Sequence, residues 1–160
     1  MLINIDLLKY SDAIKVRKEG KQTMIFDPLR KKYLVLTPEE LVRQAFVQYL
    51  INEKDYPKSK FGIEKGLQVI DLAKRYDLLI YNEKFQPALL VECKASKVDI
   101  TEKVFEQIAR YNLSLKVKYL IVTNGIKTYC CRIDYETQKF SFLKKIPSWE
   151  QLKNENNSDL

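Results

Sequence analysis

Alternating apolar and polar positions divide the first third of the chain into a hairpin and a helix. Residues 12–30 hold two such alternating runs on either side of Gly20, which predicts an N-terminal β-hairpin. A Thr-Pro-Glu-Glu run that begins at Thr37 is typical of a helix start, with Thr37 as the N-cap and Glu40 as the partner in a capping box. Apolar residues then recur at helical spacing, so we expect this helix to extend to about Asn52.

Most of the remaining pattern has the character of β-strands. Three apolar segments follow the helix, at about 61–72, 75–82 and 88–95. The short connection between the last two predicts that they pair antiparallel. After a second amphipathic helix, expected over 100–115, two or three further strands are expected, at 119–125, 128–135 and 139–143. This order predicts an α/β (α+β) fold with an αβββαβ core, in which helices flank a mixed central sheet.

Length and composition fit one globular domain. The chain has 160 residues, of which 46% are apolar and 31% charged. This length and apolar content are enough to bury a hydrophobic core, and the sequence contains no long linker. We expect a single domain over residues 1–150, with its core at 37–136, and a flexible polar tail at 151–160.

Histidine is absent, which narrows the chemistry. Ser-His-Asp and Cys-His triads and His-ligated zinc are excluded, so carboxylates, lysines and, less favoured, cysteines remain as catalytic candidates. The net charge of +7 suits a polyanionic partner such as nucleic acid, although it is equally compatible with a generally basic protein.

The cysteines and the apolar runs indicate the compartment. Cys93, Cys130 and Cys131 show no metal-ligand spacing and no disulfide framework. No run of 18 apolar residues is present, so no membrane span or membrane partner is expected. We therefore expect a cytoplasmic protein with reduced thiols.

The candidate chemistry lies on two neighbouring predicted strands. Glu92 and Lys94 are two residues apart and should project from one face, while Cys93 points to the other. Asp77, on the preceding strand, can lie beside Glu92. Mg²⁺ prefers such oxygen ligands, and Asp77, Glu92 and the backbone carbonyl of Cys93 could bind it while Lys94 positions a water or neutralises developing charge. The alternative is a structural salt bridge between Lys94 and one of the acids.

The motif set resembles the PD-(D/E)xK nuclease superfamily, and more closely the N-terminal nuclease domain of type I restriction enzyme R subunits. The matching segments are TPEELVRQ (37–44), RYDLLIY (75–81), LLVECKA (89–95), QIARY (107–111) and YLIVTNG (119–125). The resemblance implies a restriction-endonuclease-like fold and Mg²⁺-dependent DNA cleavage, with Mn²⁺ able to substitute. It implies metal binding by Asp77 and Glu92 and assistance of the attack by Lys94.

Three departures and several secondary residues qualify this resemblance. Tyr76 replaces the usual proline, Cys93 separates the Glu and Lys of the motif, and no GxxxxGK[ST] motif supports ATP use. The secondary positions are Glu39, which we favour over Glu40 as the first-helix acid, and the DNA-binding or supporting candidates Gln107, Tyr111, Arg43 and Glu64. Each has a plain structural alternative, such as core packing for Tyr111 or a salt bridge from Arg43 to Glu39.

Three functions remain open at this stage. The first is a Mg²⁺-dependent DNA endonuclease, which could act with restriction-system subunits or as a homodimer, since a double-strand cut needs two active sites. The second is a non-catalytic DNA-binding or assembly module that keeps the nuclease fold. The third is an interaction domain with no nucleic-acid role. The two acids and the lysine argue against it, because such a domain gains nothing from charges placed within a strand.

Overall fold

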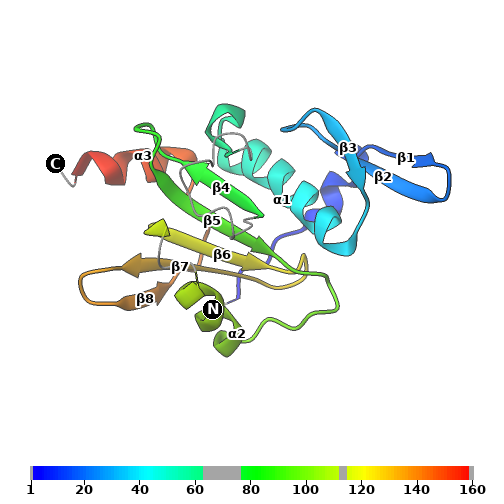
Figure 1. The fold of residues 1–160 in the computed structure, drawn as a ribbon. Helices are drawn as coiled ribbons and strands as arrows, with labels where there is room; N and C mark the ends of the chain where they lie inside the picture. Colours follow the sequence, from blue (N-terminus) through cyan, green and yellow to red (C-terminus); the bar gives the residue numbers. More distant parts are fainter. Residues whose placement is uncertain (1, 63–76, 112–114, 159–160) are drawn as a thin grey trace.

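A computed structural model describes residues 2–62, 77–111 and 115–158 and contains two separate β-sheets (Figure 1). The larger sheet has the strand order β4-β5-β6-β7-β8. Its strands are β4 (Leu78–Tyr81), β5 (Pro87–Cys93), β6 (Tyr119–Thr123), β7 (Thr128–Asp134) and β8 (Lys139–Phe142). Strands β5 and β6 are parallel and the other neighbours antiparallel, so this is the mixed sheet that the sequence predicts.

The smaller sheet extends the predicted hairpin by one strand. Its strands β1 (Val16–Glu19), β2 (Gln22–Asp27) and β3 (Lys32–Val35) are all antiparallel. The hairpin is confirmed, but the third strand is not evident from the sequence. The short Lys32–Val35 run has little alternation of its own, and it becomes a strand by pairing with β2.

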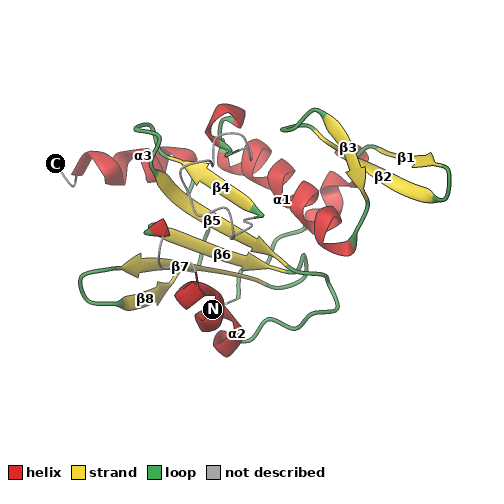
Figure 2. Ribbon diagram, in the orientation of Figure 1, coloured by secondary structure: helices red, strands yellow, loops and turns green. Residues whose placement is uncertain are grey.

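Two helices cover opposite faces of the five-stranded sheet (Figure 2). Helix α1 (Pro38–Lys54) shares a core cluster with Leu89, Val91 and Ile121. Helix α2 (Glu102–Tyr111) contributes to a second cluster with Leu90 and Leu120. Because successive residues of β5 alternate between these clusters, β5 is buried on both faces, as its continuous apolar run predicts.

Helix α1 begins where its sequence predicts. The Oγ1 atom of Thr37 accepts a hydrogen bond of 3.1 Å from the amide of Glu40 and so caps the helix. At the other end Asp55 adopts a left-handed conformation (φ 59°), and the amide of Tyr56 bonds to the carbonyl of Leu50. The helix thus ends two residues beyond the expected Asn52.

The buried stripe of α2 differs from the expected one. The sequence suggests Ile100, Val104, Ile108, Tyr111 and Leu115 as one apolar stripe. In the structure Phe105 and Ala109 are the most deeply buried residues of α2 itself, while Val104 and Ile108 are only half-buried. The tertiary contact rotates the buried face, because Phe105 packs against the ring of Phe142 at 5.0 Å.

The C-terminal segment is helical instead of a flexible tail from residue 151. Helix α3 (Trp149–Ser158) starts with reciprocal hydrogen bonds between Ser148 and Gln151. It is anchored by Leu152, which is 2% exposed, and by the Trp149 ring, which packs edge-on against Tyr56. Although the segment is mostly polar, the packing of Leu152 and Trp149 holds it as an ordered helix.

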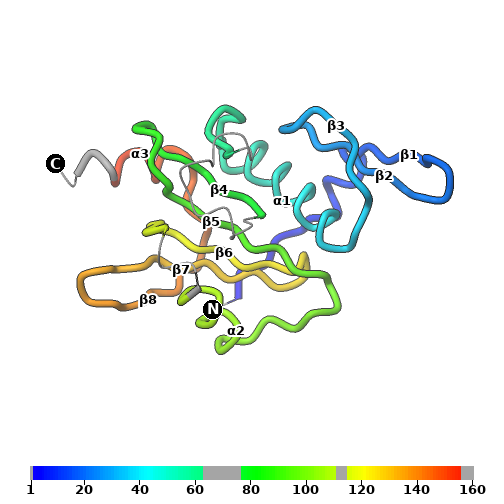
Figure 3. The backbone as a smooth tube through the Cα atoms, viewed as in Figure 1, coloured from blue at the N-terminus to red at the C-terminus, as the bar shows by residue number. Residues whose placement is uncertain are grey.

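The remaining segments complete the chain path (Figure 3). Ile3 forms a bridge with Thr128, after which the 3₁₀ helix η1 (Leu7–Ala13) packs along α1. A second 3₁₀ helix, η2 (Lys58–Lys60), precedes a bridge from Phe61 to Ile80. The rest of the strand expected over 61–72 lies outside the described residues. Among the helices of the described segments, none is long and apolar enough to cross a membrane.

Candidate active site

Asp77 and Glu92 meet at one end of the five-stranded sheet. Leu78 lies opposite Val91 in the antiparallel pair of β4 and β5, so Asp77, one residue earlier, lies across from Glu92. The two side chains hydrogen-bond to each other. The Oδ2 atom of Asp77 also accepts a hydrogen bond of 2.7 Å from the amide of Cys93. The fold thus brings together the two acids that the sequence singles out.

Strand alternation gives the third member of the group, Lys94, the same direction as Glu92. Cys93 packs in the core cluster on the α1 side, whereas Leu90, two residues before Glu92, packs on the α2 side. Lys94 lies one residue beyond β5, and its amide donates to the carbonyl of Thr123 at 2.8 Å, which continues the parallel pairing with β6. Lys94 makes no salt bridge with another described residue.

Burial and mutual repulsion change the protonation of the acid pair. Burial, together with the charge of Asp77, raises the pKa of Glu92 to about 8. Burial also raises the pKa of Asp77, although the Cys93 amide bond and the bond to Glu92 act in the opposite direction. The positive charge of Lys94 opposes both increases in pKa but does not cancel them. At neutral pH Glu92 therefore holds a proton.

A hard divalent cation fits this donor set. Two half-buried carboxylates provide the oxygen ligands that Mg²⁺ prefers, and the cation would take the place of the proton on Glu92. In residues 2–62, 77–111 and 115–158 no group of three or more His, Cys, Asp or Glu side chains could hold a metal ion. The remaining ligands would be the Cys93 carbonyl and water, as the sequence suggests.

Two polar contacts fix the loop that carries Lys94. The side-chain amide of Asn124 donates a hydrogen bond to the backbone carbonyl of Val98 at 2.8 Å, and the Lys127 ammonium pairs with the Asp99 carboxylate at 2.7 Å. Both join the segment after β5 to the turn between β6 and β7. Gly125 in this turn has φ 85°, a conformation that a side chain disfavours. The Thr123-Asn124-Gly125 segment at the end of β6 therefore helps fix the loop that carries Lys94.

The structure places Glu40, not Glu39, on the side of α1 that faces its neighbours. Glu39 is exposed. The Glu40 carboxylate instead accepts hydrogen bonds from Arg43 (2.6 Å) and Gln44 (2.8 Å). Its carboxylate is thus engaged with side chains and not, as in a capping box, with the Thr37 amide. The helical wheel does not show where Arg43 lies, and the role of Glu39 at the site stays a prediction.

Arg43 is the centre of a buried ion-pair network that the sequence does not reveal. Its guanidinium, on a residue that is 6% exposed, contacts Asp27 at 2.6 Å as well as Glu40. Arg43 does not pair with Glu39. Because it is buried, its guanidinium bonds to other protein side chains. Asp27, at 0% exposed, also accepts from the amides of Leu29 (2.9 Å) and Arg30 (3.2 Å).

Charge balance explains why this network tolerates burial. Burial opposes ionisation of Asp27, but its hydrogen bond to Arg43 and the charge of Arg43 lower its pKa below the ordinary value. The charges of Glu40 and Asp27 likewise raise the pKa of Arg43 despite its burial. The only sequence signal is the turn Asp27-Pro28-Leu29-Arg30, where an Asp side chain commonly bonds the following amides.

The network borders the acid pair. Arg43 lowers the pKa of Asp77, and both Arg43 and Glu40 act on the Cys93 thiol, whose pKa burial raises well above the ordinary value. Cys93 is thus buried between the two groups of charges. Its deep burial matches its role as a small core residue, and it offers only its backbone to the site.

The secondary candidates have mixed outcomes. Gln107 lies exposed on α2 and stays a prediction. Tyr111 is the last residue of α2, and its side chain is outside the described part of the chain, as is the whole of Glu64.

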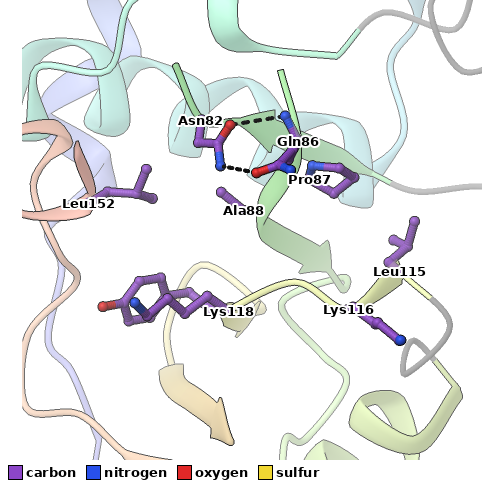
Figure 4. A pocket seen from close by; sticks show the side chains of 9 residues that line it. Asn82, Gln86, Pro87, Ala88, Leu115, Lys116, Lys118 and Leu152 are labelled. Atoms are coloured by element: carbon purple, nitrogen blue, oxygen red, sulfur yellow. Dashed lines mark hydrogen bonds between the residues drawn. The ribbon is translucent and has the colours of Figure 1, made fainter. Parts of the chain in front are cut away.

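A separate hollow of about 430 Å³ lies at the opposite ends of β5 and β6 (Figure 4). The Asn82 and Gln86 side chains line it and hydrogen-bond to each other at 3.2 Å, and Lys116 and Lys118 lie on its other side. Of the described residues that line this hollow, none carries a carboxylate, so this lining does not provide the acid pair that metal-dependent hydrolysis requires.

Comparison with known proteins points to one family. A family model described as the type I restriction enzyme R protein N terminus matches residues 38–147, a range that contains Asp77, Glu92 and Lys94. Among solved structures, a fragment assigned to an HsdR subunit of a type I restriction enzyme from Vibrio vulnificus YJ016 is 26% identical, with a TM-score of 0.40. The match covers 54% of this chain and 16% of that one. No curated protein matches the chain.

Proposed function

Because the chain belongs to the family of type I restriction enzyme R protein N-termini, we propose that it is a metal-dependent DNA endonuclease of the PD-(D/E)xK type. In this proposal Asp77 and Glu92 bind Mg²⁺, Lys94 assists the attack on phosphorus, and the domain acts in a type I restriction system. The observation that carries it is the hydrogen bond between the Asp77 and Glu92 side chains, with the positive charge of Lys94 acting on both acids.

Each residue of the group has a distinct task. Asp77 and Glu92, with the Cys93 carbonyl, would hold the cation, and bound Mg²⁺ would orient the scissile phosphate and acidify a water. The Cys93 amide orients the Asp77 carboxylate. Lys94 provides a positive charge where negative charge develops on the phosphate oxygens.

The acid pair also defines a condition for activity. Glu92 holds a proton at neutral pH in the metal-free protein, because its pKa is about 8. This proton must leave before both acids can bind a cation, so cation affinity should increase as the pH rises towards 8. Cleavage should therefore be stronger at pH 8 than at pH 6 at a fixed, subsaturating Mg²⁺ concentration.

Plasmid cleavage tests the proposal. Purified protein is incubated with supercoiled plasmid and Mg²⁺ or Mn²⁺ without ATP, beside Asp77→Ala and Lys94→Ala. Lys97→Ala serves as the control, because Lys97 is an exposed lysine on the same loop. We expect nicking or linearisation by the wild type and by Lys97→Ala, and loss of at least 100-fold in rate for the other two variants.

Two results would contradict this proposal. Equal background nicking by wild type and variants would remove the catalytic role of the site. Salt-sensitive DNA binding with no cleavage under either cation would support the alternative, a non-catalytic DNA-binding or assembly module that keeps the nuclease fold.

A further inference from the structure

The three-stranded sheet carries most of the net charge of the chain. Between Lys15 and Lys32 there are seven basic residues against two acidic ones, Glu19 and Asp27. This leaves +5 of the total +7 within 18 residues. Asp27 is buried and neutralised by Arg43, so the surface of this segment is more positive than the count indicates. We refer to residues 15–35 as the basic arm.

The lysines of the basic arm are exposed and available to a ligand. None of the five lysines makes an ion pair with any described residue. They are Lys15, Lys18, Lys21, Lys31 and Lys32. The other two basic residues are paired, Arg17 with Glu19 and Arg30 with Asp27 at 3.8 Å. Five unneutralised ammonium groups on one small sheet repel one another, a cost that a polyanion would relieve.

Aromatic rings stiffen the basic arm. The Phe26 and Tyr33 rings, directly opposite across β2 and β3, lie 5.2 Å apart. The guanidinium of Arg17 stacks over Tyr33 at 3.7 Å. The ammonium of Lys15 lies 5.9 Å from the Phe26 ring centre. These contacts hold the strands as a firm platform and keep cations on its surface.

One end of the basic arm is linked to the candidate active site through Arg43. Asp27, the last residue of β2, bonds to Arg43, whose charge acts on Asp77. Lys31 and Lys32 lie at this end, beside Asp27 in the sheet register, and Lys18 and Lys21 lie at the other. At about 3.3 Å per residue, β2 spans roughly 20 Å, close to six phosphates along one DNA strand. Figure 1 shows the sheet projecting beyond the first turn of α1.

We propose that the basic arm binds the phosphate backbone of duplex DNA and extends the DNA contact from the Asp77–Glu92 pair outward. The inference rests on the proposed function in that the duplex is the same one that the site cleaves. The arm presents exposed ammonium groups along its strands, which suits a regular polyanion and contact with phosphates instead of base readout. The arm therefore supplies affinity without sequence specificity.

Fluorescence anisotropy with a labelled 30-base-pair duplex tests this proposal without any need for cleavage. The measurement is made in EDTA over a range of NaCl concentrations. The arm variant is Lys18→Gln/Lys21→Gln/Lys31→Gln. The matched control is Lys139→Gln/Lys144→Gln/Lys145→Gln, which removes the same charge from exposed lysines around β8. Thermal unfolding monitored by circular dichroism verifies that both variants fold.

We expect the arm variant to bind at least tenfold more weakly at 150 mM NaCl. Its slope of log K against log [NaCl] should be shallower by about 2.7, which is about 0.9 for each of three lost phosphate contacts. The control should stay within twofold of wild type. Equal weakening of both variants, or no change in the arm variant, would overturn the proposal. Tighter binding of a 30-base-pair RNA duplex, with the same lysine dependence, would overturn the choice of DNA.

The two proposals fail in different ways. If the wild type binds DNA through the arm but does not cleave plasmid with Mg²⁺ or Mn²⁺, the nuclease proposal falls and the arm stands. If cleavage depends on Asp77 while the arm variant binds like wild type, the arm falls and the nuclease stands.

Discussion

The carboxylate of Asp77 accepts a hydrogen bond of 2.7 Å from the backbone amide of Cys93, the residue that separates Glu92 from Lys94. This bond lowers the pKa of Asp77 against the effect of its burial, whereas Glu92 receives no such help and is further repelled by Asp77. In the metal-free protein Glu92 is therefore the acid that keeps its proton at neutral pH. The predictions on pH and metal binding follow from this asymmetry.

Stability in EDTA should fall as the pH rises from 6 to 8.5. The pKa of Glu92 is about 8 in the folded protein against 4.5 for a free side chain, so the folded state binds the proton more tightly. The stabilisation is complete below the unfolded pKa and is lost as the pH passes the folded pKa. We expect urea denaturation to show a loss of about 2–3 kcal/mol in this interval.

Glu92→Gln isolates the origin of that loss. The neutral amide cannot ionise, so this variant should be more stable than wild type at pH 8.5 and should lose little stability between pH 6 and 8.5. Glu83→Gln, at an exposed acid on the β4–β5 connection, should follow the wild type. A Glu92→Gln protein with the same pH dependence as wild type would contradict the assigned protonation.

Divalent cations should stabilise the wild type at pH 8. Binding to the folded state alone adds about 1.4 kcal/mol when the cation is tenfold above its dissociation constant. We expect Mg²⁺ or Mn²⁺ to raise the melting temperature, EDTA to reverse the effect, and the rise to be smaller at pH 6, where the proton competes. Asp77→Asn should abolish the rise and Asp12→Asn should keep it, because Asp12 is an exposed acid on η1.

Arg43→Met should destabilise the fold strongly. It would leave Asp27, at 0% exposed, as a buried charge without its partner, and we expect a loss of about 3–5 kcal/mol in urea denaturation. Arg17→Met removes an exposed ion pair with Glu19 and should cost under about 1 kcal/mol. Similar losses in the two variants would mean that the buried network contributes no more than a surface pair.

Leu152→Ala tests whether α3 is part of the folded core. Leu152 is 2% exposed in the cluster on the α1 side of the sheet, so its truncation should cost about 2–5 kcal/mol. The exposed Asn154, on the same helix, provides the control Asn154→Ala, which should leave the midpoint within experimental error. A neutral effect of Leu152→Ala would restore the interpretation of this segment as a flexible tail.

Features that depend on neighbours in sequence could be predicted well. Thr37 caps α1 because a cap is completed within three residues. The direction of Glu92 and Lys94 follows from strand alternation, and the approach of Asp77 follows from a short antiparallel connection. The roles of these three residues in metal binding and catalysis remain predictions.

Features that depend on distant partners could not be predicted. The local pattern favours Glu39 as the first-helix acid, but the contacts that engage Glu40 come from Arg43, which turns towards Asp27 sixteen residues earlier. Likewise β3 requires β2, and α3 requires the Tyr56 ring.

The sequence by itself thus determined the order of helices and strands, the absence of histidine chemistry, and the presence of two acids and a lysine that could meet. Only the tertiary structure decided that Arg43 joins Asp27 to α1, and that the basic arm lies at the same end of the sheet as the acid pair. The physical reason is that capping and alternation operate over a few residues, whereas burial and charge pairing join residues that are far apart in the chain.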